Sequence, residues 1–243
     1  MPFPLIHLLV ADELLACKSR SKNDAAQFLL GSLGPDAVHY REFLPEDKNS
    51  LGPAKKITHL CPVSDERWGQ VTDNEGWIES VRDFVKESEP IVHHEGSLPQ
   101  SSGATHPLQY RTRSFIEGYA VHALTDLHNN KTIWSRFRTY HPDEAAKGYK
   151  SDYYQDLISI DRQLYQTSPQ VSRIWELLAE ARPCDMPGLV SEEEIRAIHE
   201  NILHEYCQGL TQAYRQEYKY VTYEELLAWV NQAVDFIESV LDF

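Results

Sequence analysis

The chain is short of positive charge and of cysteine. Its 23 lysines and arginines stand against 37 acidic residues, which gives a formal net charge of −14 at pH 7. Because a phosphate backbone is bound by basic surfaces, we expect no binding to a nucleic-acid duplex. The 4 cysteines show no Cys-x-x-Cys spacing. The absence of this spacing disfavours a cysteine-based zinc site and indicates reduced thiols in a cytoplasmic protein.

Long apolar runs are also missing. A membrane-spanning helix needs about 20 consecutive apolar residues, whereas the apolar run at residues 4–17 is interrupted by His7, Asp12 and Glu13. No positive charge precedes this run, so it does not have the pattern of a secretory signal. We therefore expect no transmembrane segment, no signal peptide and a cytoplasmic location.

The hydrophobic pattern is helical. No stretch alternates between apolar and polar residues for long enough to predict a strand. Two helices should begin at capping boxes, "SEEE" at 191–194 and "TYEE" at 222–225, in which a hydroxyl group and a glutamate three residues later cap the first turn. With no repeat and no linker, the prediction is a single all-α domain over residues 1–243. Its predicted helices are 4–17, 23–32, 74–88, 110–128, 151–167, 169–181, 192–218 and 223–242.

Histidine and aspartate occur where a core helix does not need them. His122 and Asp126 lie inside the apolar frame of "GYAVHALTDLHNN", residues 118–130. At four residues apart they share one face of a helix, and burying them unpaired would cost several kcal/mol. Either a hydrogen bond or a metal ion must satisfy them. At this spacing an imidazole nitrogen and a carboxylate oxygen can reach the same ion.

Three other segments carry similar residues. His7 lies in the first apolar helix, Asp36 follows the sharp turn "GSLGP", and His59 lies between apolar residues of "KKITHLCP". Each of these alone is more typical of a core histidine or a turn aspartate. With His122 and Asp126 they form a His/Asp set from four separated segments, which suits zinc, iron or manganese better than magnesium or calcium. The remaining histidines are expected at the rim or surface, among them His39, His93, His94, His106, His199 and His204.

Taken in order, "FLLGSLGPDAVH", "ITH" and "GYAVHALTDLH" resemble the bacterial branch of the zinc-dependent phospholipase C superfamily, which also includes the P1-type nucleases. The motifs cover about residues 1–130, with a vaguer likeness to about residue 165. The resemblance implies an all-helical fold of the phospholipase C/P1 nuclease type with a metal cluster in a cleft. It also implies hydrolysis of phosphate esters.

The resemblance further implies a ligand set. Asp36, His59, His122 and Asp126 would surround one metal ion, and His7 would belong to a second ion that shares Asp126. The expected cofactors are one to three divalent ions, zinc first, with iron or manganese as alternatives. Such ions polarise phosphoryl oxygens and lower the pKa of water. Asp36 would be the catalytic carboxylate that orients or deprotonates the attacking water.

The chain departs from this family at two points. The secreted lipases offer the amine and carbonyl of an N-terminal tryptophan to a metal, and a downstream "H-x-x-x-E" helix completes a third site. Neither feature occurs here; instead, the acidic segment "YKSDYYQDLISIDRQLY" follows at 149–165. Candidates for a third metal site are therefore His128, His141, Asp152, Asp156 and Asp161.

The leading prediction is a phospholipase C-like hydrolase or phosphodiesterase that uses metal ions. Its substrate would be a small phosphorylated molecule or a phospholipid head group. Phosphohydrolases of the HD type need an adjacent His-Asp pair, and that dipeptide does not occur in the chain. The alternative is a non-catalytic metal-binding or interaction protein that keeps the same fold.

Overall fold

The computed structural model describes residues 3–16, 19–44, 54–62, 71–88, 90 and 111–241. In these residues every named element is a helix, and an isolated antiparallel bridge joins Met186 to Val190. The all-α prediction is therefore confirmed. No helix within the described ranges is long and apolar enough to cross a membrane. The longer helices are α1 (Pro4–Ala16), α2 (Lys22–Gly31), α4 (Asn74–Glu87), α5 (Arg113–Lys131), α6 (Ile133–Tyr140), α8 (Asp152–Thr167), α9 (Val171–Glu180), α10 (Glu192–Asn201) and α12 (Tyr223–Val240).

Two helix starts agree with the sequence because their caps can be read from it. One helix end differs from the prediction because long-range contacts set it. Ser191 and Thr222 both form the predicted capping boxes. The predicted helix to residue 218 is wrong: α10 continues as a π-turn, η3 (Ile202–Tyr206), and the short α11 (Cys207–Leu210), and no helix follows until α12. The backbone N–H groups of Lys219 and Tyr220 donate instead to the buried carboxylate of Asp156, at 2.9 and 2.7 Å.

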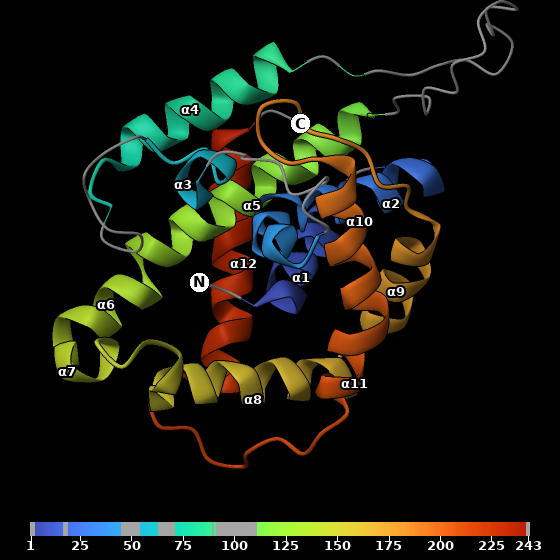
Figure 1. Cartoon of the computed structure of the whole chain (residues 1–243). Helices are drawn as coiled ribbons and strands as arrows, with labels where there is room; N and C mark the ends of the chain where they lie inside the picture. Colours follow the sequence, from blue (N-terminus) through green and yellow to red (C-terminus); the bar gives the residue numbers. More distant parts are fainter. Residues whose placement is uncertain are drawn as a thin grey trace, which may run out of the picture.

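Helix α5 runs obliquely across the centre of the molecule, with α12 crossing it (Figure 1). Of its 19 residues, 16 are buried, and so are ten of the 13 residues of α1. Neither helix has a solvated face, because α2, α4 and α12 pack around α5 while α8 and α12 also contact α1. Polar side chains on these two helices must therefore find their partners inside the protein.

Glycines allow α2 and α5 to touch through their backbones. A Cβ at Gly31 would lie 2.2 Å from the carbonyl oxygen of Phe115, and a Cβ at Gly118 would lie 2.0 Å from that of Phe28. Both distances are impossible contacts, so only glycine fits at the crossing. Gly34 in turn leaves room for the ring of Tyr119, whose Cδ2 would be 2.6 Å from an added Cβ.

Replacing Gly118 with alanine should destabilise the protein. A helical Gly→Ala change normally stabilises by about 0.5–1 kcal/mol, but here the methyl group would push two backbones apart, and overpacking costs roughly 1–3 kcal/mol. The free energy of urea unfolding measures the effect. Gly209→Ala in α11 is the matched control, because an added Cβ there meets nothing within 4 Å. A Gly118→Ala protein as stable as the control would contradict the close packing.

Candidate metal centre

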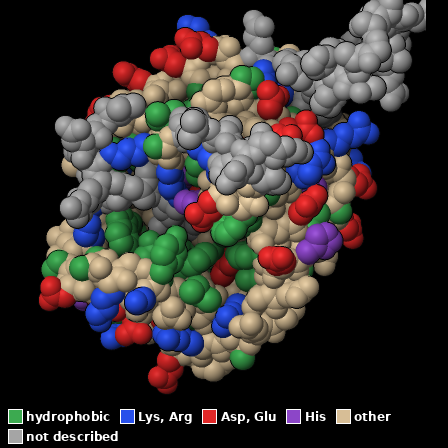
Figure 2. Space-filling model, viewed as in Figure 1, with side chains coloured by type: hydrophobic (Ala, Val, Ile, Leu, Met, Phe, Trp, Pro, Cys, Tyr) green, Lys and Arg blue, Asp and Glu red, His purple; other side chains and the backbone are tan. Residues whose placement is uncertain are grey.

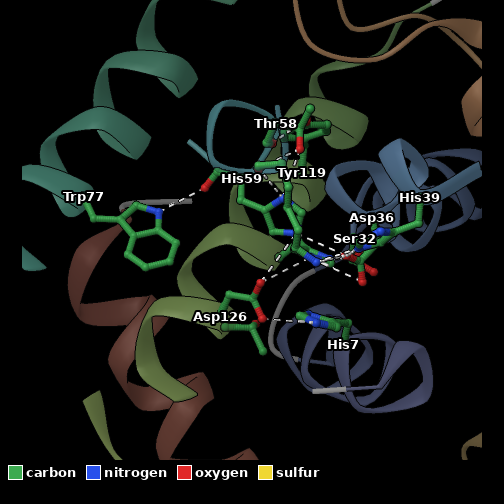
Figure 3. A network of polar contacts seen from close by, with 12 residues as sticks. His7, Ser32, Asp36, His39, Thr58, His59, Trp77, Tyr119 and Asp126 are labelled. Atoms are coloured by element: carbon green, nitrogen blue, oxygen red, sulfur yellow. Dashed lines mark hydrogen bonds and ion pairs between the residues drawn. The ribbon is translucent and has the colours of Figure 1, made fainter. Parts of the chain in front are cut away.

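Four elements bring the predicted His/Asp set to one place. Helix α5 supplies His122 and Asp126, α1 supplies His7, the 3₁₀ helix η1 (Gly34–Phe43) supplies Asp36, and His59 follows the short helix α3 (Lys55–Thr58). Figure 3 shows His7, Asp36, His59 and Asp126 turned toward a common region. All three imidazoles are 0% exposed, Asp126 is 3% exposed and Asp36 is 9% exposed.

The spacing of the donor atoms is close to what a shared ion requires. His59 Nε2 lies 3.2 Å from Asp36 Oδ1 and 3.6 Å from Asp126 Oδ2. His122 Nε2 lies 3.8 Å from Asp126 Oδ2 and 4.0 Å from Asp36 Oδ2, and His7 Nε2 lies 3.7 Å from Asp126 Oδ1. Atoms bound tetrahedrally to one ion at about 2.0–2.2 Å lie roughly 3.3–3.6 Å apart. Two sets of three residues, His7–Asp36–His122 and His59–His122–Asp126, have all their ligand atoms within 4.8 Å of one another.

Backbone carbonyls fix the tautomers of two of these histidines. His122 Nδ1 lies 2.7 Å from the carbonyl oxygen of Ser32, and His59 Nδ1 lies 2.9 Å from that of Lys55. A carbonyl oxygen only accepts, so each Nδ1 carries the proton and each Nε2 presents a lone pair to the carboxylates. Two lone pairs face each other favourably only with a proton or a metal ion between them. Metal-binding histidines are commonly oriented in this way, through their second ring nitrogen.

Several donor atoms of the set have no hydrogen bond to any described residue. They are both nitrogens of His7, Nε2 of His122 and both oxygens of Asp126. A buried polar atom without a partner costs about 1–3 kcal/mol. A metal ion would satisfy one nitrogen of His7, Nε2 of His122 and the oxygens of Asp126 together, so the residues present fit such an ion.

The protonation states also suit metal binding. Burial, with the neighbouring His122, lowers the pKa of His7 well below its ordinary value, and burial lowers the pKa of His59 to about 4. Burial alone would raise the pKa of Asp36. Lys55 and the adjacent side chains of His39 and His59 outweigh that effect, so the pKa of Asp36 stays well below its ordinary value. At neutral pH, His7 and His59 are neutral and Asp36 is ionised, as metal ligands must be.

The loop that carries His59 is held by hydrogen bonds from two aromatic side chains. Tyr119 donates from its hydroxyl group to the carbonyl oxygen of Thr58 at 2.6 Å, and Trp77 donates from Nε1 to that of His59 at 3.0 Å. Leu60 has a φ of 56°, a left-handed conformation that costs a non-glycine residue about 1–3 kcal/mol. These contacts hold the strained turn and with it the direction of the imidazole.

The residues predicted for a third metal site do not come together. In the part of the chain that the structure describes, no group of three metal-ligating side chains includes any of them. Their separate surroundings explain why, since each aspartate already has its own cation or donor. Asp152 pairs with Lys219 at 2.9 Å, Asp156 accepts from Arg215 at 3.3 Å, and Asp161 accepts from Tyr206.

The two histidines of that proposed third site lie in aromatic surroundings. The ring of His128 lies 5.4 Å from Trp229 and 5.1 Å from Phe236, both on α12. The ring of His141 lies 4.9 Å from that of Tyr220. The five residues predicted for a third site therefore lie outside the cluster of candidate ligands that the described residues form, and a third metal site stays a prediction.

The histidines predicted at the rim or surface differ in their burial. His199 was expected at the surface because its helix is rich in glutamate, but it is 8% exposed and its Nε2 lies 2.7 Å from the carbonyl oxygen of Leu178. His204 is exposed, as predicted, and His39 is exposed beside Asp36. The expected rim histidines His93, His94 and His106 lie outside the described residues.

Sequence reasoning missed Lys55, whose Nζ lies 3.1 Å from Asp36 Oδ1. Its position four residues before His59 is the only available signal. Because Lys56 is adjacent, the sequence alone does not indicate which of the two lysines contacts Asp36.

A cavity of about 870 Å³ opens beside the centre. Asp36 and His39 line one side of it, and Glu200 and Glu205 line it from α10 and η3. Hydrophobic side chains gather around a hollow on the face shown in Figure 2. The cavity has aromatic walls and gives a small molecule a route to Asp36. The aromatic residues of its lining are Phe3, Tyr40, Phe43 and Tyr149.

Comparisons of the chain with protein-family models, with curated proteins and with solved structures found no match. The family resemblance of the three motifs therefore stays a prediction. The function has to be inferred from the geometry and chemistry of the site.

The metal-free protein should lose stability as the pH falls from about 6.5 to about 4. Burial lowers the pKa of both His59 and His128 from 6.5 to about 4. Between these values the unfolded chain binds more protons than the native state, so the free energy of unfolding rises with pH. Asp161 acts in the opposite direction, because burial raises its pKa from 3.8 to about 7 and the native state then binds the extra proton.

Asp161→Asn separates the two contributions. It keeps an oxygen for the hydroxyl group of Tyr206 and removes the opposing titration. Urea unfolding in excess EDTA at pH 4.5–7.5 should show a steeper rise of stability with pH in this variant than in the wild type. Equal slopes would contradict the raised pKa of Asp161, and an Asp161→Asn protein whose stability does not fall toward pH 4 would contradict the lowered pKa values of His59 and His128.

Proposed function

We propose that the chain is a metal-dependent hydrolase of phosphate esters, with zinc as the preferred ion. The observation that supports this proposal is the set of unpaired, buried donor atoms on His7, His122 and Asp126, with Asp36 and His59 beside them and a cavity at Asp36. Two sets of three ligands that share His122 suit one or two ions. Imidazole and carboxylate ligands also accept iron or manganese.

The chain's own residues divide into those that hold the metal and one that faces the substrate. A divalent ion bound here would polarise a phosphoryl oxygen and lower the pKa of a water molecule. His7, His59, His122 and Asp126 would hold it, since all four are enclosed. Asp36 is the one carboxylate of the set that lines the cavity. Its Oδ1 already contacts Lys55, His39 and His59, so Oδ2 is the atom that would accept the proton of the attacking water.

The substrate that fits these surroundings is a small phosphorylated molecule or a phospholipid head group. The cavity walls are aromatic and partly acidic, and the chain has a net charge of −14. A nucleic-acid duplex would meet repulsion along its backbone. A single phosphate group would meet mainly the metal centre, whose ion sets the local charge.

The first test is metal content with activity. The purified protein should contain one or two divalent ions by mass spectrometry and should hydrolyse bis-p-nitrophenyl phosphate. Chelation should abolish the hydrolysis and lower the melting temperature, because a ligand bound only to the native state stabilises it. Readdition of zinc, manganese or iron should restore both. Protein that is full of metal and cleaves no phosphate ester would support a non-catalytic metal-binding protein instead.

Asp36→Asn tests the role of the cavity-facing carboxylate. The change keeps the shape and removes the basicity, so kcat should fall by about 10²–10⁴-fold, the usual loss when a general base is removed. Asp83→Asn is the matched control, because Asp83 is exposed on α4, and its activity should equal that of the wild type. If the Asp36→Asn protein retains full activity with its metal, Asp36 is not the base.

A further inference from the structure

Lys55 places an ammonium group at the edge of the candidate metal centre. Within the described residues it is the one lysine or arginine at ion-pair distance from the five candidate ligands. Its Nζ lies 3.1 Å from Asp36 Oδ1 and 2.6 Å from His39 Nε2. Its carbonyl oxygen accepts from His59 Nδ1, so the same residue orients one ligand through its backbone and contacts another through its side chain.

This position is unfavourable in a site that only holds metal. An ammonium group beside Asp36 competes with a divalent cation for the same carboxylate and repels that cation, since like charges at a few ångströms repel strongly in a partly buried site. The arrangement becomes favourable when an anion lies between the two positive charges. The Lys55 side chain is 21% exposed. Its two partners, Asp36 and His39, both line the cavity, so the ammonium group contacts two residues of the cavity wall.

We propose that Lys55 binds a non-bridging oxygen of the substrate's phosphate group, at the cavity side of the metal centre. This inference rests on the proposed function and adds a phosphate-binding residue to it. An ammonium group makes strong charge-assisted hydrogen bonds to phosphate oxygens and acts as a compact point charge on a flexible stem. In a chain with a net charge of −14, a local cation also counters the repulsion that an approaching phosphate would meet.

Calorimetry can separate metal binding from anion binding. Zinc is titrated into chelated wild type, Lys55→Met and Lys55→Arg, and inorganic phosphate is then titrated into each zinc-loaded protein. Lys22→Met is the control, because Lys22 pairs with Glu180 at the surface with 63% of its side chain exposed. Lys55→Met should bind zinc at least as tightly as the wild type and bind phosphate about 10- to 100-fold more weakly, the range for losing a hydrogen bond to a charged group. Lys55→Arg should restore most of the phosphate affinity.

Each other result would overturn the inference in a recognisable way. A parallel loss of zinc and phosphate affinity in Lys55→Met would mean that the lysine only holds Asp36 in place. Unchanged phosphate affinity in that variant, or a zinc-loaded wild type that binds no phosphate, would remove Lys55 from anion binding and leave the metal centre intact. A wild type that takes up no zinc would overturn the metal centre and this inference together.

Discussion

The backbone contact between α2 and α5 is the constraint on which the rest of the site depends. Gly31 and Gly118 let the two helices approach until a Cβ on either would collide with a carbonyl oxygen of the other helix. One helical turn after Gly118, His122 meets the carbonyl oxygen of Ser32, the residue that follows Gly31. That contact fixes the imidazole with Nε2 toward Asp36 and Asp126. Glycines that the sequence shows only as parts of motifs are therefore packing residues that bring two ligand segments into register.

The same packing creates an energetic problem inside the core. Helices α1 and α5 have no solvated face, so the side chains of His7, His122 and Asp126 cannot turn to water. Each unpaired buried polar atom costs about 1–3 kcal/mol, and a whole domain is stable by only about 5–15 kcal/mol. A fold that tolerates several such atoms at one point needs a compensating interaction there. A divalent cation is the group that the imidazoles and the carboxylates of this cluster could share.

Much of this cluster could be predicted because its residues violate a local rule. His7, His122 and Asp126 stand in apolar frames, and such residues need partners wherever the chain folds. Residues outside the cluster follow no such rule. Asp156 has the sequence pattern of a candidate ligand, but its carboxylate accepts hydrogen bonds from the backbone of residues 219–220, more than 60 positions away. His199 looked exposed from its glutamate neighbours, although the carbonyl oxygen of Leu178 on α9 holds it inside. Long-range partners of this kind leave no local periodicity in the sequence.

The two central aspartates show how surroundings can give one residue type two roles. Asp126 is enclosed by His7, His59 and His122 and has no ion pair with a lysine or arginine of the described chain. Asp36 has Lys55 and His39 on one oxygen and reaches the cavity. A cation at Asp126 would be shielded from water, whereas a molecule in the cavity would meet Asp36 first. The centre therefore has an inner side rich in candidate ligands and an outer side with a carboxylate and an ammonium group, and under the proposed function this polarity would give a phosphate group one direction of approach.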